Sequence, residues 1–315
     1  MLSRVAESFY WLARNVERAE SVARILDVNY VRAMDLYATH DGRSERLWRS
    51  VLRCAGFMND PASEPNLHAA AEALTYCAFA ADNASSIRSC VRIARSNALA
   101  IRAELATEVW ETVNVLYLFV ESSNASSVLR AGPSRFLRRI RDATQALAGV
   151  ADAVLSHGEG WNFLQVGRFL ERAYMTARVL AAIEVDDEPW AESQRLLEMC
   201  CASEPFAKGS SRSPEARDAV DFVVLAADFP RSLRFCTREV DRAMHRITFA
   251  PHGTFANDAE RRLGRLRARF DFTPLEELLV LGPHAFATEA TIEFEELGAA
   301  IETTYFPRLP RAVAG

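Results

Sequence analysis

The chain has 315 residues, of which 50% are hydrophobic and 25% charged, and this ordinary globular composition excludes a disordered or fibrous protein. Its length is sufficient to bury a large core. The formal net charge of −5 argues against a nucleic-acid-binding protein, because such proteins usually present a basic surface to the phosphates.

The N-terminal sequence MLSRVAESFYWLARNVERAE predicts a helix that is packed on two opposite sides. One side of the helical wheel is apolar and carries Val5, Phe9, Leu12, Val16, Ala19 and Ala23. The other side mixes charged residues with aromatic and aliphatic ones, namely Glu7, Tyr10, Trp11, Arg14, Arg18, Val22 and Ile25. Packing on both sides leaves little surface for solvent, so we expect these charges to be at least partly buried. A buried charge is retained only with a partner or a ligand.

The same stretch has a charge in every helical turn and no apolar run long enough for a signal peptide or a membrane span. We therefore expect a cytoplasmic protein without membrane association. The six cysteines form no C-x-x-C pair and no zinc spacing, which favours reduced and mostly buried thiols. None of the six histidines has a glutamate three residues before it, as a di-iron bundle requires, so we expect no metal. No phosphate-loop, dinucleotide or serine-hydrolase motif occurs, so we expect no cofactor.

Helical periodicity continues along the rest of the chain and predicts an all-α protein. The clearest stripe follows Pro133, with apolar residues spaced by alternating steps of four and three, at Phe136, Ile140, Ala143, Leu147, Val150 and Val154. Glycine, proline, aspartate and serine cluster between such segments. The sequence therefore predicts a multi-helix bundle of roughly a dozen helices joined by short connections.

Two pairs of segments indicate an internal repeat. Residues 13–26 (ARNVERAESVARIL) share seven of fourteen positions with residues 167–180 (GRFLERAYMTARVL), and DNASSIRSCVR at 82–92 aligns with DFPRSLRFCTR at 228–238. We interpret the chain as a single domain, 1–315, that contains two homologous halves, 1–157 and 158–300, with a C-terminal helix and tail at 284–315. Such halves commonly pack about a pseudo-two-fold axis, which is our hypothesis for this chain.

All four repeated segments carry arginines four residues apart, at Arg14/Arg18, Arg88/Arg92, Arg168/Arg172 and Arg234/Arg238. Residues at this spacing share a helix face, so each pair of like charges requires an anion opposite it. Glu17 and Glu171 are candidates for that anion, along with eight further glutamates: Glu7, Glu104, Glu108, Glu111, Glu289, Glu293, Glu295 and Glu296. Two interpretations remain open: a structural network of Arg–Glu ion pairs, or a site in which some guanidinium groups are free to bind a carboxylate or a phosphate. The candidate anion-binding residues are these eight arginines together with Glu17 and Glu171.

Several of these segments resemble the bacterial alpha-E domain family. The resemblance rests on MLSRVAESFYWLARNVERAESVARILDV, SSIRSCVRIAR, VWETVN, GWNFLQVGRFLERAYMTARVL and FPRSLRFC, and it spans nearly the whole chain. The Glu-Arg signature of the family falls on Glu17-Arg18 and Glu171-Arg172, with Arg14 and Arg168 one turn earlier. The resemblance implies an all-helical protein associated with a circularly permuted ATP-grasp protein and a transglutaminase-like protease.

From this resemblance we expect an accessory or catalytic partner of an ATP-grasp amide or peptide ligase. Its arginine-lined cleft would bind an anionic amino acid, an activated acyl group or a peptide carboxylate. Arg14, Arg18, Arg168 and Arg172 would hold the anion, and the two glutamates would orient them. No catalytic residue is assigned, and Glu7 is named only as a candidate proton acceptor. The alternative is a non-catalytic protein–protein interaction module whose Arg–Glu network is purely structural.

Overall fold

The computed structural model describes residues 1–36, 43–55, 70–183, 189–209, 215–251 and 253–307. Over these residues it contains fifteen α-helices and no strand, so the predicted all-α class is confirmed. The N-terminal helices are α1 (Ser3–Leu36), α2 (Arg43–Ala55), α3 (Ala70–Phe79), α4 (Ile87–Ala100), α5 (Thr107–Ser122), α6 (Ala125–Ala131) and α7 (Pro133–Val154). They are followed by α8 (Glu159–Ala182), α9 (Pro189–Met199), α10 (Ser203–Gly209), α11 (Ala216–Leu225), α12 (Leu233–Thr248), α13 (Asp258–Phe272), α14 (Leu275–Leu278) and α15 (Pro283–Tyr305).

The expected number of helices, roughly a dozen, was too low. Helices α6 and α10 have seven residues each and α14 has four. Segments of one or two turns are too short to show a repeating apolar stripe, so periodicity alone does not reveal them.

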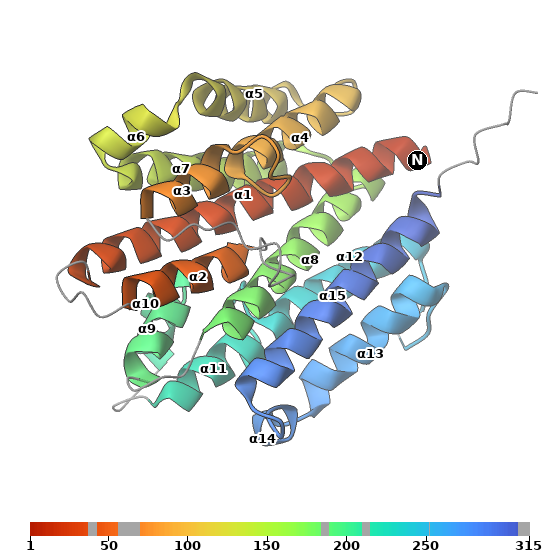
Figure 1. The fold of residues 1–315 in the computed structure, drawn as a ribbon. Helices are drawn as coiled ribbons and strands as arrows, with labels where there is room; N and C mark the ends of the chain where they lie inside the picture. Colours follow the sequence, from red (N-terminus) through yellow and green to blue (C-terminus); the bar gives the residue numbers. More distant parts are fainter. Residues whose placement is uncertain (37–42, 56–69, 184–188, 210–214, 252, 308–315) are drawn as a thin grey trace, which may run out of the picture.

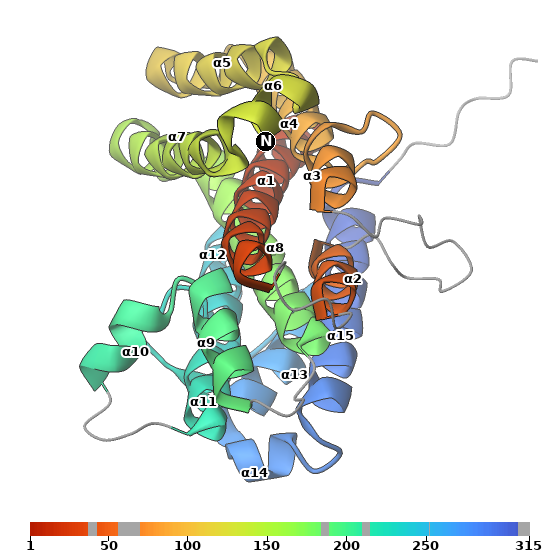
Figure 2. The same ribbon diagram turned by 60° about the vertical axis from the view of Figure 1, so that its left-hand side comes forward.

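Helices α1 and α8 lie side by side through the centre of the molecule (Figure 1). Helix α1 also contacts α4 and α7, and α8 contacts α12 and α15. In the second view, α4 to α7 lie on one side of this central pair and α12, α13 and α15 on the other (Figure 2). The central helices are therefore covered by other helices along much of their length.

Matching local structures begin the helices that flank this centre. Ser86 is the N-cap of α4 and also donates to the carbonyl of Ala80, while Ser232 caps α12 and donates to the carbonyl of Ala226. Helices α7 and α15 both begin with a proline after a glycine with positive φ, 84° at Gly132 and 87° at Gly282.

Both predicted stripes of α1 are packed against neighbouring helices. On the mixed stripe Tyr10 and Val22 are 0% exposed, and Arg14 is 8% exposed, so the prediction that charges on this helix are buried is confirmed. Arg18 and Glu7 are half-buried. All six cysteines are free thiols, and five of them are buried. No helix among the described residues is both long enough and apolar enough to cross a lipid bilayer.

Candidate functional site

A reciprocal exchange of ion pairs joins α1 to α8. The Nε and Nη2 atoms of Arg172 donate to the two carboxylate oxygens of Glu17 at 2.6 and 2.9 Å. In the opposite direction, Nε and Nη2 of Arg18 donate to Glu171 at 2.5 and 3.1 Å. Both contacts are bidentate, which is the strongest geometry for a guanidinium–carboxylate pair. Each helix thus supplies one Glu-Arg pair to the other.

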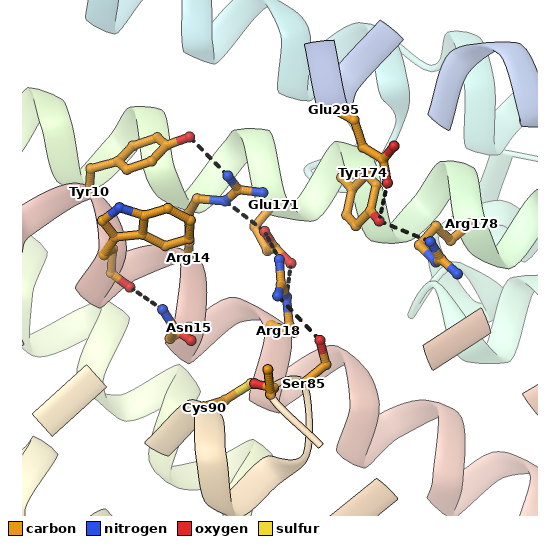
Figure 3. Close-up of polar contacts among 12 residues, drawn as sticks. Tyr10, Arg14, Asn15, Arg18, Ser85, Cys90, Glu171, Tyr174, Arg178 and Glu295 are labelled. Atoms are coloured by element: carbon orange, nitrogen blue, oxygen red, sulfur yellow. Dashed lines mark hydrogen bonds and ion pairs between the residues drawn. The ribbon is translucent and has the colours of Figure 1, made fainter. Parts of the chain in front are cut away.

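Arg14 of α1 is a second arginine partner of Glu171, beside Arg18 (Figure 3). Its Nε donates to Glu171 at 2.8 Å, and its Nη1 lies 3.0 Å from the Tyr10 hydroxyl and 3.5 Å from a carboxylate oxygen of Glu302. Burial raises the pKa of Glu171, but the charges of Arg18 and Arg14 outweigh that effect and lower the pKa below its usual value. On this side every guanidinium group has a carboxylate.

The Glu17 side contains two further residues, Glu20 of α1 and Arg231, which lies just before α12. Arg231 lies 3.4 Å from Glu17 and donates to Glu20 at 2.8 Å. Glu20 also pairs with Arg24 in the next turn of α1. Burial raises the pKa of Glu17, but Arg172 and Arg231 outweigh this effect and lower the pKa to about 2. The carboxylates on this side are therefore fully engaged.

Arg168 has no such partner. In the sequence repeat it aligns with Arg14, yet it makes no hydrogen bond or ion pair with any residue that the structure describes. Its Nε is buried without a partner, and its guanidinium carbon lies 5.3 Å from the centre of the Phe169 ring. Burial and the neighbouring charge of Arg172 lower the pKa of Arg168 from its usual value. Arg168 is thus a half-buried cation that forms no ion pair with a described residue, and the charges of Glu17 and Asp152 act on it only from a distance.

A cavity of about 450 Å³ opens beside Arg168, a size within the usual range for small-molecule sites. We call it the Arg168 cavity. Its polar end carries Glu17, Glu20, Arg168, Arg172 and Arg231, and its apolar wall comes mainly from α1, α7 and α8 through Leu12, Ala13, Val16, Leu147, Ala148, Ala151, Leu164 and Phe169. Hollows of about 760 and 850 Å³ lie elsewhere, but no predicted site residue lines either of them.

The charge at the polar end of the Arg168 cavity is unbalanced. Three guanidinium groups meet two carboxylates there: Arg168, Arg172 and Arg231 against Glu17 and Glu20. Two more acids line the cavity, Asp152 and Glu239, and neither forms an ion pair with Arg168. Asp152, whose side chain is 64% exposed, lies beside His157, and Glu239 pairs with Arg242. The excess positive charge therefore lies at the buried end.

The other four predicted arginines lie outside this group and are paired. Arg88 lies 4.0 Å and Arg92 2.7 Å from Glu121 of α5. In the same manner Arg234 and Arg238 both contact Asp271 of α13, at 3.1 and 2.7 Å. Because each pair holds one carboxylate between two helices, we assign these four residues to helix packing.

Glu7, the candidate proton acceptor, is half-buried on α1 and makes no hydrogen bond with a described residue. It does not line the Arg168 cavity. The structure therefore places Glu7 away from the unpaired cation, and no proton-transfer role follows from its position.

Sequence reasoning missed three residues at the polar end: Glu20, Arg231 and Gln165. Glu20 lies one turn after Glu17 on the same helix face, so its place beside Glu17 could have been predicted from the sequence of α1. The role of Arg231 could not have been predicted from the repeat, because the aligned residue in the first half is Ser85, a neutral residue. The Ser85 hydroxyl lies 3.3 Å from Arg18. Gln165, a neutral residue of α8 that lines the cavity, belongs to no charge pattern.

Comparison with known proteins places this architecture in a family. Residues 1–306 match the Alpha-E family model, which describes a predicted alpha-helical domain with a conserved ER motif. Two proteins from Mycobacterium tuberculosis strains and one from Mycobacterium bovis, all named as uncharacterized, are each 22% identical over 293 residues. The alignment covers 87% of this chain but only 33% of those relatives, so the chain spans about a third of their length. No solved structure matches. Since the family model covers nearly all of the sequence, and the central exchange is built from two Glu-Arg pairs, the chain belongs to the Alpha-E family.

Proposed function

We propose that this Alpha-E domain binds a small anionic substrate, a carboxylate or an acyl phosphate, in the Arg168 cavity. We further propose that it does so as an accessory or catalytic partner of an ATP-grasp amide or peptide ligase. The observation that carries the binding proposal is the unpaired guanidinium of Arg168 beside a cavity of about 450 Å³.

The energetic argument concerns the cost of an unpaired charge. A charge that is withdrawn from water without a counterion destabilises the fold by several kcal/mol unless an anion joins it. Neither Glu17 nor Glu20 forms an ion pair with Arg168, since both are held by other guanidinium groups. A bound carboxylate or phosphate would supply it, and the planar donors of guanidinium match both groups.

The two interpretations of the arginine pattern thus apply to different residues. Arg14, Arg18 and Arg172 have glutamate partners and support the structural network. Arg168 supports the binding site. The domain proposal explains this division: we propose one domain of two halves, 1–157 and 158–300, related by a pseudo-two-fold axis between α1 and α8. In the half 158–300, Arg231 stands where the other half has Ser85, and Arg168 of that half is left available to a ligand.

The proposed partnership is supported by the length of the relatives and by the family resemblance. The mycobacterial relatives carry about two thirds of their length outside the matched region, so the domain operates there next to other polypeptide. An ATP-grasp ligase forms an acyl phosphate, which is an anion with an organic tail. A cavity with a cationic end and an apolar wall suits such a group.

Isothermal titration with 4-methylpentanoate, a carboxylate with an apolar tail, tests the binding proposal. We expect one molecule bound per chain and an affinity at least about tenfold lower in Arg168→Gln, since one charge-assisted contact is worth about 1.5–3 kcal/mol. Arg92→Gln is the control, because its ion pair with Glu121 lies elsewhere. Inorganic phosphate and acetyl phosphate are titrated in parallel. If none of the three anions binds, or if Arg168→Gln binds them as well as the unaltered chain, the proposal is wrong.

A second candidate function is docking of the ligase without any ligand, and one surface favours it. Phe272, Val280 and Leu281, around α14, are 81%, 76% and 84% exposed. Exposed apolar side chains gathered within ten residues are typical of a contact surface. If this surface docks an ATP-grasp ligase, the double variant Phe272→Ser/Leu281→Ser should no longer retain that ligase in a co-purification and should still bind 4-methylpentanoate. Retention of that partner would exclude this surface.

A further inference from the structure

A second polar group faces the Arg168 cavity without a partner. Gln165 of α8 lines the cavity, is 6% exposed, and makes no hydrogen bond with any residue in the described part of the chain. Its amide offers two donor hydrogens and one acceptor oxygen. The Gln165 amide atoms keep some accessible surface where the residue lines the cavity, so they are available to a partner that the chain itself does not provide.

Gln165 and Arg168 are three residues apart on one helix. Residues at that spacing lie on the same face, with Cβ atoms about 5–6 Å apart, and both side chains line the same cavity. A ligand that contacts both must therefore carry an anionic group and an amide-like group within a few bonds of each other.

Much of the remaining wall of the cavity is apolar and partly aromatic, and Thr144 and Gln145 of α7 add polar groups to it. Leu12 and Val16 approach from α1, and Leu147 approaches from α7. The indole of Trp161 also lines the cavity and stacks on the His157 ring with 4.0 Å between centroids. This wall has room for a branched aliphatic or an aromatic side chain.

The charge at the polar end discriminates against a free amino group. A free amino acid would bring its ammonium next to its carboxylate, and therefore close to Arg168 and the neighbouring guanidinium groups of Arg172 and Arg231. Like charges at such distances repel, and the effect is stronger away from bulk water. Acylation of the nitrogen removes that charge and leaves an amide N–H and a carbonyl.

We infer that the Arg168 cavity takes an N-acyl amino acid with an apolar side chain, the chemistry found at the C-terminal residue of a peptide. Its carboxylate pairs with Arg168, and its amide exchanges hydrogen bonds with the amide of Gln165. Its side chain packs on the wall formed by α1 and α7. This inference rests on the proposed function, because it names the substrate class of the same cavity.

Isothermal titration with four ligands tests the inference: N-acetyl-leucine, leucine, 4-methylpentanoate, which lacks the amide, and N-acetyl-leucine amide, which lacks the carboxylate. We expect N-acetyl-leucine to bind at least tenfold more tightly than each of the others. In Gln165→Leu the advantage over 4-methylpentanoate should disappear, while the affinity for 4-methylpentanoate itself changes less than about twofold, because its only polar contact is with Arg168. Gln194→Leu, an exposed position on α9, is the matched control.

The possible results separate the two proposals. Equal binding of N-acetyl-leucine and 4-methylpentanoate, or a preference that survives in Gln165→Leu, overturns the inference and leaves the proposed function standing. Failure of every carboxylate to bind overturns the inference, and the proposed function falls with it if inorganic phosphate and acetyl phosphate also fail to bind. Tighter binding of leucine than of N-acetyl-leucine also overturns the inference, since it would show that the cavity accepts the ammonium. If Gln165→Leu does not fold, the four ligands on the unaltered chain still decide between these results.

Discussion

Gly167 of α8 lies directly against the carbonyl group of Tyr10 in α1. A Cβ atom added at Gly167 would lie 2.3 Å from the Tyr10 carbonyl oxygen and 3.1 Å from its carbonyl carbon. The neighbouring atoms are backbone, so they cannot rotate away as a flexible side chain would. The absence of a side chain at this position therefore sets how closely the two helices approach, one turn before Glu171.

Replacement of Gly167 by alanine should separate α1 from α8. We expect the free energy of unfolding to fall by about 1–3 kcal/mol, the usual cost of overpacking, despite the better helix propensity of alanine. Gly264→Ala on α13 is the matched control, because nothing lies within 4 Å of its added Cβ and the position is exposed. That variant should be up to about 1 kcal/mol more stable. Urea unfolding measures both, and equal stability of the two variants would contradict the close approach.

Neutralising Glu171 should lower the free energy of unfolding more than neutralising most other acidic residues. Its carboxylate is 0% exposed and accepts hydrogen bonds from both Arg14 and Arg18. Glu171→Gln leaves two buried guanidinium groups with weakened pairing, so we expect a loss of about 3–5 kcal/mol in unfolding free energy. Glu45→Gln interrupts an exposed pair with Arg49 and should cost less than about 1 kcal/mol. A comparable loss in both variants would mean that the central pair is no better shielded from water than the surface pair.

The same ion pairs predict sensitivity to acid. The pKa of Glu17 is lowered from its ordinary 4.5 to about 2 in the folded chain. A carboxyl group whose pKa is lower when folded stabilises the fold above pH 4.5, and this contribution disappears as the pH falls from 4.5 towards 2. Its full size is on the order of 3 kcal/mol.

Unfolding measured as a function of pH checks this sign. Glu17→Gln should be less stable than the unaltered chain at pH 7, and its stability should fall less steeply between pH 4.5 and 2. The lowered pKa of Glu171 acts in the same direction and remains in the variant, so some slope persists. Parallel curves for the two proteins would show that Glu17 does not titrate in this window.

The sequence predicted the burial of the central arginines because helix geometry is local. Two stripes on one helical wheel were enough to predict that α1 is packed on both sides, and the repeated Glu-Arg pairs placed Glu17 and Glu171 among the candidate opposing charges. The prediction needed no knowledge of the fold.

The state of each arginine could not be predicted in this way, because it depends on contacts between distant segments. Arg168 is left unpaired because Arg172 and Arg231 both contact Glu17. Arg231 follows Pro230, which is 58 residues beyond Arg172 in the sequence, and the two segments meet where Arg172 donates to the Pro230 carbonyl. Gln165 shows the same limit, because its lack of a partner is visible only where α1, α7 and α8 enclose the cavity.

Arg14 and Arg168 provide the sharpest comparison, since they align in the repeat and differ in pairing. Arg14→Gln removes a partner of Glu171, and because Arg18 remains we expect a loss on the order of 2 kcal/mol in unfolding free energy. Arg168→Gln removes a charge that has no counterion, so the variant should lie within about 0.5 kcal/mol of the unaltered chain or be more stable.

Thermal unfolding of both variants, with and without 4-methylpentanoate, measures this difference. The unaltered chain and Arg14→Gln should both be stabilised by the ligand through mass action, whereas Arg168→Gln should not. A large loss of stability in Arg168→Gln without ligand would place Arg168 in the structural network, because only a residue that already holds the fold together is costly to remove from the free protein. An unchanged stability together with a lost ligand response would instead separate the two roles of the arginines, with Arg14 stabilising the helix pair and Arg168 binding the anion.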